Sequence, residues 1–104
     1  MRTLALDLST KSSGWSVFIN QELKYYGCIT AGSTNVYNRI DKMVEEIEKL
    51  IKEYEVDKVV IEDVIPEDVH NNNTVFKVLI YLQGFIVHKL DQYKLVPTFF
   101  TASE

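Results

Sequence analysis

The sequence predicts an α/β fold in which one mixed five-stranded sheet packs against helices, in the chain order β-β-β-α-β-α-β. Two observations carry this prediction. Three short segments rich in β-branched and aromatic residues come first, separated by turn residues. Two longer segments with apolar residues at three- and four-residue spacing then alternate with two further apolar runs.

The first three strands are expected over residues 3–8, 15–19 and 23–30. A turn-rich stretch over 9–14 separates the first two, and a second turn at 20–22 separates the next two. Connections this short cannot make a parallel crossover, so the three strands should form an antiparallel meander.

An amphipathic helix is expected over residues 36–54, after three candidate N-caps, Ser33, Thr34 and Asn35. Its apolar residues recur at helical spacing, and the glutamates between them should form a solvated face. The apolar stripe consists of Val36, Ile40, Met43, Val44, Ile47, Leu50, Ile51 and Tyr54.

A fourth strand is expected over residues 56–64. Because a helix precedes it, this strand should lie parallel to the first or the third. A polar loop over 66–73 then leads to the second helix, residues 74–92, which is apolar on more than one side. Such a helix is either central to the fold or buried by another subunit. Gly84 within it indicates close backbone contact with a neighbour.

The fifth strand is expected over residues 94–101, with Pro97 marking a bulge or an edge. The chain ends before a further helix that would cover the rest of the sheet. We therefore expect a single domain over residues 1–104 that is truncated at its C-terminus.

Composition and charge exclude several classes of protein. The longest uncharged apolar run, residues 78–82, is too short to span a bilayer, so no membrane partner is expected. The lone Cys28 suits a reducing cytoplasm and is expected to be a small buried hydrophobe. Residues 41–68 hold 11 acidic and 4 basic side chains, whereas the remainder holds 4 acidic and 7 basic. A basic surface for nucleic acid is therefore compatible with the net charge of −4.

Two carboxylates interrupt apolar strands: Asp7 in the first and Glu62 after residues 59–61 in the fourth. Burying them is costly unless a partner compensates. If the strands are neighbours, about 4.8 Å apart, the carboxylates repel each other unless a divalent cation lies between them. All-oxygen ligands favour Mg²⁺, with Mn²⁺ as the alternative.

A structural explanation competes with the metal site. In it, Asp7 caps the following turn through Ser9 or Thr10, and Glu62 pairs with a lysine such as Lys11. The sequence alone leaves both explanations open.

Other ionisable residues are not expected in this site. Asp63 alternates to the face opposite Glu62. His70 lies in a loop and His88 on a helix, and both are expected at or near the surface. No cluster of cysteine and histidine predicts zinc.

Residues 4–17 (Leu-Ala-Leu-Asp-Leu-Ser-Thr-Lys-Ser-Ser-Gly-Trp-Ser-Val) resemble the first hairpin of the ribonuclease H-like superfamily. Three further segments narrow the resemblance to the RuvC-like Holliday-junction resolvases, particularly the phage-type branch. They are residues 59–64 (Val-Val-Ile-Glu-Asp-Val), the asparagine-rich loop and residues 82–84. The resemblance covers residues 3–104. It implies a ribonuclease H-like sheet with the first and fourth strands adjacent. It also implies a homodimer, which we expect to form through the apolar helix 74–92, that nicks branched DNA.

The resemblance further implies that Asp7 and Glu62 are catalytic metal ligands, with Asp7 bridging two Mg²⁺ ions and Glu62 holding one. The family completes this site with acidic residues on a helix beyond the fifth strand, and Glu104 lies too early to replace them. Ile65 stands where the family often has an aromatic wedge for the junction, which leaves an aliphatic wedge.

The turn after Asp7 is a candidate DNA contact. Its residues are rich in hydroxyl groups and carry one positive charge, which suits a phosphate backbone and no sequence readout. The alternative is a plain hairpin turn. The residues concerned are Ser9, Thr10, Lys11 and Ser12.

Three functions follow from these observations. The first is a metal-dependent endonuclease that resolves branched DNA, although the 104 residues alone need not be active. The second is a non-catalytic junction-binding or dimerisation module with an incomplete acidic site. The third is a phosphate-handling fragment of an actin-like ATPase, which the lack of further glycine-rich phosphate loops disfavours.

Overall fold

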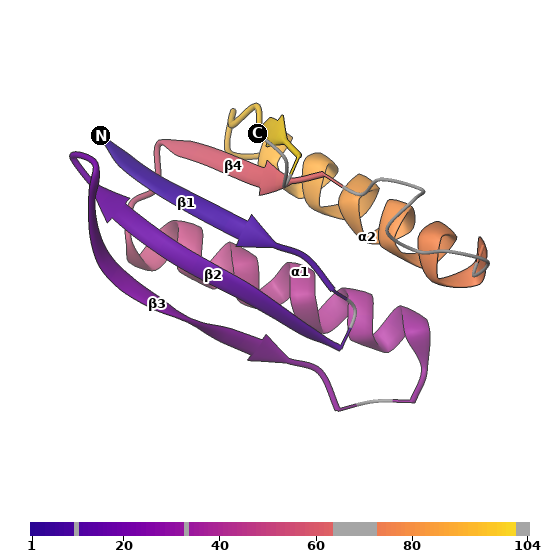
Figure 1. Ribbon diagram of the computed structural model, residues 1–104. Helices are drawn as coiled ribbons and strands as arrows, with labels where there is room; N and C mark the ends of the chain where they lie inside the picture. Colours follow the sequence, from indigo (N-terminus) through magenta and orange to yellow (C-terminus); the bar gives the residue numbers. More distant parts are fainter. Residues whose placement is uncertain (10, 33, 64–72, 102–104) are drawn as a thin grey trace.

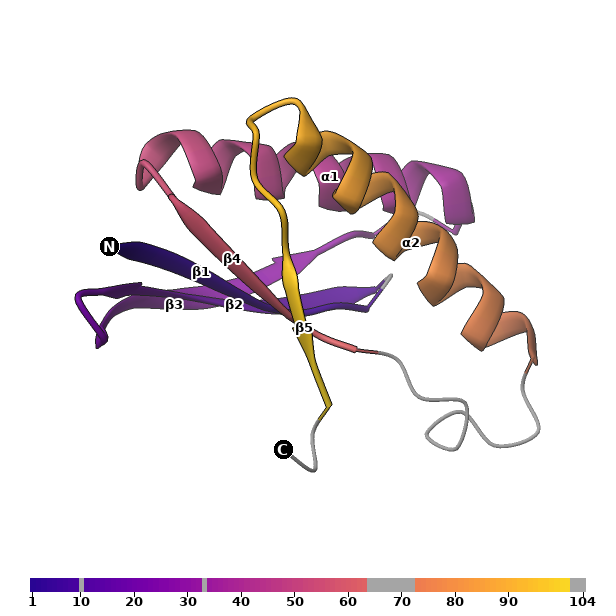
Figure 2. The ribbon, with the colours of Figure 1, turned by 90° about the horizontal axis from the view of Figure 1, so that it is seen from above.

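One five-stranded sheet, in the order β3-β2-β1-β4-β5, carries two helices on one of its faces (Figures 1 and 2). The computed structural model describes residues 1–9, 11–32, 34–63 and 73–101, and the side chains of the last range from residue 76 onward. The elements are β1 (Arg2–Asp7), β2 (Ser12–Ile19), β3 (Glu22–Thr30), α1 (Val36–Glu53), β4 (Lys58–Glu62), α2 (Asn73–Asp91) and β5 (Thr98–Phe100). This order confirms the predicted mixed α/β fold.

Strands β1, β2 and β3 form the predicted antiparallel meander. The turn between β2 and β3 places Asn20 and Gln21 at φ 51° and 72°. Two consecutive left-handed residues are typical of the turn whose twist matches that of the flanking strands. Beyond α1, β4 pairs with β1 in parallel, which is one of the two predicted arrangements.

The largest differences from the predicted strand boundaries are in β2 and β5. Strand β2 begins at Ser12 instead of residue 15, because Ser12, Ser13 and Gly14 pair with the end of β3. Strand β5 covers only Thr98–Phe100 instead of 94–101. Lys94 has a φ of 58° and closes the turn after α2, so the extended backbone starts later.

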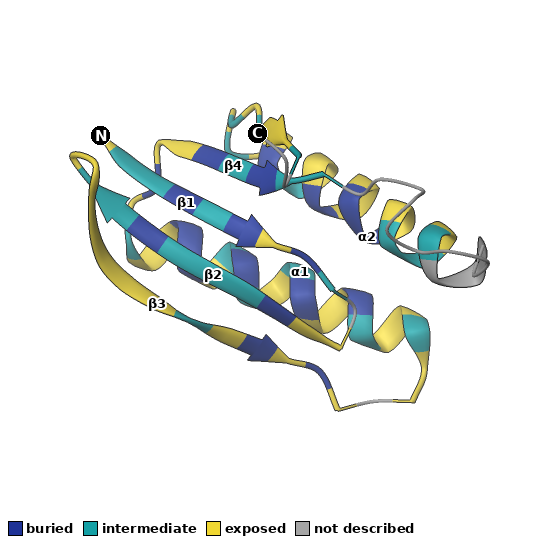
Figure 3. Cartoon of the chain, in the orientation of Figure 1, coloured by how far each residue is buried: buried dark blue, intermediate teal, exposed yellow. Residues whose placement is uncertain are grey.

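Helix α1 begins as predicted at one of the candidate caps. The Asn35 side-chain oxygen accepts hydrogen bonds from the backbone N–H groups of Tyr37 (2.9 Å) and Asn38 (3.1 Å). The helix lays its apolar stripe on the sheet (Figure 3); its buried residues are Ile40, Met43, Ile47, Leu50 and Ile51. Its outer side carries the predicted charged face, in which lysines lie three or four residues from glutamates.

Helix α2 is apolar on two sides, as predicted. Leu82, Ile86 and Leu90 are buried in the shared core, whereas Tyr81 and Phe85 are exposed (Figure 3). Over the described residues, neither helix is long and apolar enough to cross a membrane.

One expectation about small residues is wrong, and another, a close contact at Gly84, has no partner within the described chain. Cys28 is exposed, because it lies on the face of β3 that no helix covers. A Cβ added at Gly84 would meet no atom of the described chain within 4 Å, so this glycine serves no close contact inside the molecule. Both residues lie on surfaces that the sequence pattern alone did not distinguish from the core.

The C-terminal ends of the two helices are joined by one polar cluster. The Tyr93 hydroxyl donates a hydrogen bond to Glu48, and the Lys89 ammonium lies 3.8 Å from the same carboxylate. The hydrogen bond from Tyr93 lowers the pKa of Glu48, and Lys89 and Lys52 act in the same direction. A lowered folded-state pKa means that this contact stabilises the fold above the ordinary carboxyl pKa and ceases to do so as the pH falls.

We expect Tyr93→Phe to lower the melting temperature at pH ~7, with a difference from wild type that shrinks as the pH falls towards ~3. Protonated Glu48 no longer needs the hydrogen bond, so the variant has less to lose in acid. Thermal unfolding followed by circular dichroism measures this. Tyr37→Phe, a change at an exposed tyrosine of α1, is the control. A difference that stays constant over the pH range would contradict the assignment.

Candidate active site

The carboxylates of interest lie at the ends of two neighbouring parallel strands. In the β1–β4 ladder Leu6 pairs with Ile61, and Asp7 and Glu62 are the next residues of their strands. Parallel strands end at the same edge of a sheet, so both carboxylates come to one edge. This confirms the adjacency of the first and fourth strands and brings the two residues together.

The helices leave one face of the sheet open (Figure 2). Asp7 and Glu62 each follow a buried residue of their strand, Leu6 and Ile61, so alternation turns both carboxylates to the open face. Leu4 and Leu6 of β1 are 0% and 2% exposed, because they point into the core, and alternation turns Asp7 the other way. Asp7 and Glu62 line one open cavity of about 230 Å³. Its other lining residues are Ala5, Leu6, Gly14, Trp15, Ser16, Gly27 and Phe100.

The burial of the pair differs from the sequence-based expectation of two buried carboxylates. Asp7 is exposed and Glu62 is half-buried, since each ends its strand instead of interrupting it. Desolvation is therefore a smaller cost than the pattern suggested. Within the part of the chain that the structure describes, no ion pair involves Asp7.

The turn after β1 is held by a serine that the sequence did not single out. The buried Ser13 hydroxyl donates to the backbone carbonyl of Ser9 (2.6 Å) and accepts from its N–H (2.9 Å). Among the described residues, these Ser13 bonds close the turn, and no hydrogen bond joins Asp7 to Ser9. The other predicted partner of Asp7 in the turn, Thr10, lies outside the described residues. A Cβ on Gly14, the partner of Asp7 in β2, would lie 3.9 Å from the Asp7 Cβ. This glycine keeps the space beside Asp7 open.

The predicted DNA-contacting residues differ in their exposure, and two of them lie outside the described part of the chain. Ser9 is half-buried, while Lys11 and Ser12 are exposed beside the carboxylate edge. Thr10 and Ile65 lie outside the described residues, as does His70. His88 is exposed on α2, away from the carboxylates.

Asp63 faces away from the pair, as predicted. Its carboxylate accepts a hydrogen bond from the Gln83 amide of α2 (3.4 Å), and its backbone N–H donates to the Phe100 carbonyl (2.6 Å). Phe100, which pairs with Glu62 across the ladder, lines the cavity. No feature of the sequence indicated that position, because the pairing of β5 depends on the whole fold.

The donor set fits a hard divalent cation. Two carboxylates at one open cavity offer oxygen ligands, which Mg²⁺ and Mn²⁺ prefer, and leave room for water. Across the described ranges, no group of three or more histidine, cysteine, aspartate or glutamate side chains is placed to hold a metal ion. Asp7 and Glu62 would therefore supply only part of a ligand set.

Comparison with known proteins assigns the chain to a family. The family model of the crossover junction endodeoxyribonuclease RuvC matches residues 3–104. The chain belongs to the RuvC family. No curated protein sequence matches it significantly.

Solved structures share the fold of this chain. Thermus thermophilus RuvC in complex with a Holliday junction substrate superposes with a TM-score of 0.85 at 8% identity, over 99% of this chain and 66% of that one. Another T. thermophilus RuvC structure superposes with a TM-score of 0.79 at 9% identity, over 97% of this chain and 64% of that one. A ROK hexokinase from T. thermophilus superposes with a TM-score of 0.59 at 12% identity, over 97% of this chain and 35% of that one. These likenesses show the fold, and the chain spans just under two thirds of the length of the two RuvC chains.

We expect Asp7→Asn and Glu62→Gln each to weaken Mn²⁺ binding by about tenfold or more, since even outer-shell changes have effects of that size. Paramagnetic broadening of amide NMR signals during a Mn²⁺ titration measures this. In the wild type, broadening should centre on the ends of β1 and β4. Asp63→Asn, a neighbouring carboxyl facing α2, should bind like the wild type. Equal binding by all three variants would refute the site.

Proposed function

We propose that this chain is the nuclease domain of a structure-specific endodeoxyribonuclease that resolves branched DNA by hydrolysing phosphodiester bonds. The observation that supports this most directly is the shared cavity of Asp7 and Glu62 at the ends of adjacent strands, in a chain of the RuvC family. Its proposed setting is the cytoplasm. The phage-type branch, and a domain truncated before a further helix, stay predictions.

The cavity suits a backbone phosphate better than a base. It is open, and its lining includes the small residues Ala5, Gly14 and Ser16. In hydrolysis a water oxygen attacks phosphorus and one P–O bond of the backbone breaks. Bound Mg²⁺ would supply an activated water and neutralise charge on the leaving oxygen. Asp7 and Glu62 would hold the ions, and exposed Lys11 would attract the phosphate backbone.

We expect Asp7→Asn and Glu62→Gln to abolish cleavage of a four-way junction in Mg²⁺ while junction binding persists. Each change keeps the side-chain shape and removes the ligand charge. Gel assays of nicking and of binding measure the two effects separately. Glu45→Gln, on the exposed side of α1, is the matched control and should cleave normally. Cleavage by both site variants would end the nuclease proposal.

A non-catalytic junction-binding module is the second candidate. The observation that favours it is the small ligand set, because no third acidic residue joins Asp7 and Glu62 within the described ranges. The same assay separates the two functions. Tight junction binding by the wild type with no nicking in Mg²⁺ or Mn²⁺ would select the binding module.

Pairing of two copies through α2 is part of the proposal. Ile80, Tyr81, Gly84, Phe85 and His88 surround a shallow apolar hollow of about 360 Å³ on the exposed side of this helix. Tyr81 and Phe85 are 49% and 50% exposed and line one hollow together with Ile80, and a contiguous apolar patch of this kind often marks an interface. Gly84 lies in the hollow and would let a second helix approach closely. A two-fold pair would present two carboxylate sites to one junction.

We expect Phe85→Glu to convert a dimer into a monomer, because a charge at the centre of an apolar contact must be desolvated. Sedimentation velocity over a range of protein concentrations measures the change. Val96→Glu places the same charge at a highly exposed apolar residue outside α2 and should leave the dimer intact. A wild type that stays monomeric at high concentration, or a Phe85→Glu variant that still dimerises, would contradict this interface.

A further inference from the structure

Two aromatic side chains lie on the open face of the sheet, on either side of the carboxylate cavity. Phe100 of β5 pairs with Glu62, and side chains that pair across neighbouring strands point to the same face. On the other side of the cavity, Tyr26 of β3 pairs with Ser16, which pairs in turn with Ala5. Ser16 and Ala5 both line the cavity. Because β3 and β5 are the outer strands of the sheet, the two carboxylates lie between the two rings (Figure 2).

The position of Tyr26, more than its exposure, suits contact with a ligand. Tyr26 is 77% exposed, but Tyr37 on α1 is also 65% exposed, so exposure alone says little. The preceding residue, Tyr25, faces the helices and stacks on Tyr54 with ring centroids 4.6 Å apart. Tyr26 points to the open face, where the small residue paired with it leaves its ring uncovered. Within the described residues, the Tyr26 side chain makes no hydrogen bond or ring contact.

The backbone holds Phe100 at the cavity. Its carbonyl accepts a hydrogen bond from the Asp63 N–H (2.6 Å), and the parallel ladder aligns β5 with β4 at Glu62. The Phe100 side chain is 38% exposed and lines the cavity together with Asp7 and Glu62. A metal ion and a bare phosphate offer nothing apolar to such a ring, whereas a nucleotide also offers the faces of its base and sugar. The cavity therefore suits a phosphate that belongs to a nucleotide chain.

We infer that Tyr26 and Phe100 bind bases of the DNA strand by stacking, on the two sides of the phosphate that lies at Asp7 and Glu62. Every base has a π-face, so aromatic rings hold a strand whatever its sequence. A base can stack on a protein ring only where it has left the base stack of the duplex. The open face therefore binds a strand that is unpaired or unstacked, as occurs where DNA branches. This inference rests on the proposed function and specifies the form of its substrate.

The spacing of the two rings fits one DNA strand that crosses the sheet. Neighbouring strands lie ~4.8 Å apart, so Phe100 is one such spacing from Glu62, and Tyr26 is two spacings, ~10 Å, from β1. One strand of B-DNA advances ~3.4 Å per nucleotide, so each ring lies within about three nucleotides of the carboxylates. The side chains between Tyr26 and Asp7 are small, which lets the sugar-phosphate backbone approach the sheet closely.

A single-stranded oligonucleotide and its abasic counterpart test the stacking, because the abasic strand keeps the sugars and phosphates and lacks the bases. In fluorescence anisotropy, the wild type should bind the intact strand at least about tenfold more tightly than the abasic one. Tyr26→Ala and Phe100→Leu should each weaken binding of the intact strand by about tenfold and leave binding of the abasic strand unchanged. Tyr26→Phe keeps the ring and should restore the affinity. Tyr37→Ala, which removes a comparably exposed tyrosine from α1, is the control.

Cleavage of a four-way junction, measured on the same proteins, separates this inference from the proposed function. If Tyr26→Ala and Phe100→Leu bind the intact strand like Tyr37→Ala while the wild type cleaves junctions, the stacking is wrong and the nuclease proposal stands. If both changes remove the preference for the intact strand but the wild type nicks no junction in Mg²⁺ or Mn²⁺, the nuclease proposal fails and the stacking surface stands.

Two further results would overturn the inference. The first is a wild type that binds the abasic strand as tightly as the intact one, or binds neither strand. The second is a loss of self-association in Tyr26→Ala, seen by sedimentation velocity, with unchanged binding of the intact strand. That result would assign this part of the open face to a second copy of the chain.

Discussion

The parallel register between β1 and β4 is the constraint on which the candidate site depends. Leu6 and Ile61 are directly paired and almost completely buried, so the apolar core holds the two strands in this alignment. A slip of one residue would turn every side chain of a strand to the other face. Such a slip would bury Asp7 or Glu62 under the helices and expose a leucine or isoleucine. The energy that positions the two carboxylates therefore comes from hydrophobic burial one residue away, and they need no bond to each other.

Because the helices pack on only one face of the sheet, its two faces have different roles. Helices α1 and α2 cover one face and complete a single core there (Figures 1 and 2). On the other face, β1 presents Thr3, Ala5 and Asp7, and β2 presents Gly14 and Ser16. Small and polar residues on this face would contribute little to a hydrophobic core. On an open face they form a surface that an extended polymer can approach closely. The alternation of each central strand thus encodes stability on one side and ligand access on the other.

The sequence predicts well whatever depends on local periodicity. The element order, the Asn35 cap and the parallel placement of β4 all followed from spacing and turn chemistry. Side-chain exposure followed less well, because it depends on which face the helices cover. Cysteine is a residue type often found in cores, but Cys28 points to the open face. Asp7 lies in an apolar stretch of the sequence, yet it is exposed at the end of its strand. The sequence did not predict that Ser13 holds the turn after β1, because hydrogen bonds between residues four apart leave no distinctive pattern in a sequence.

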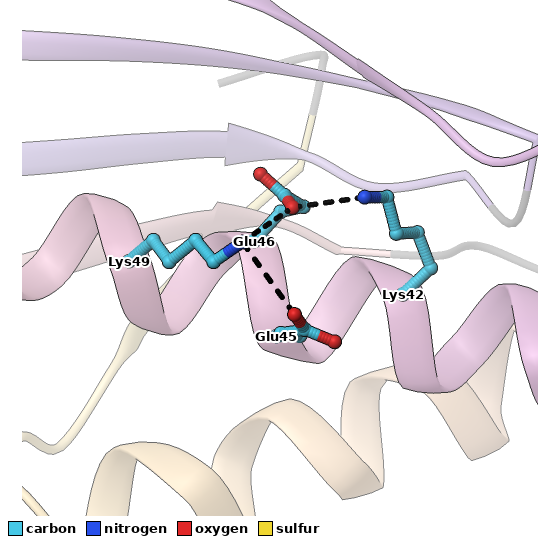
Figure 4. A network of polar contacts seen from close by, with 4 residues as sticks. All are labelled: Lys42, Glu45, Glu46 and Lys49. Atoms are coloured by element: carbon cyan, nitrogen blue, oxygen red, sulfur yellow. Dashed lines mark hydrogen bonds and ion pairs between the residues drawn. The ribbon is translucent and has the colours of Figure 1, made fainter.

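The acidic composition is compatible with a nucleic-acid surface because its charges are separated in space. On α1, Glu46 accepts a hydrogen bond from Lys42 (3.0 Å), which lowers the pKa of that carboxyl, and Lys49 lies 3.2 Å from the same group (Figure 4). These glutamates are locally neutralised, and α1 lies across the sheet from the open face. Exposed charges are largely screened beyond about 8–10 Å at physiological salt. A DNA strand on the open face would therefore respond to the few charges that line it, and the net charge of the whole chain has little bearing on whether it binds.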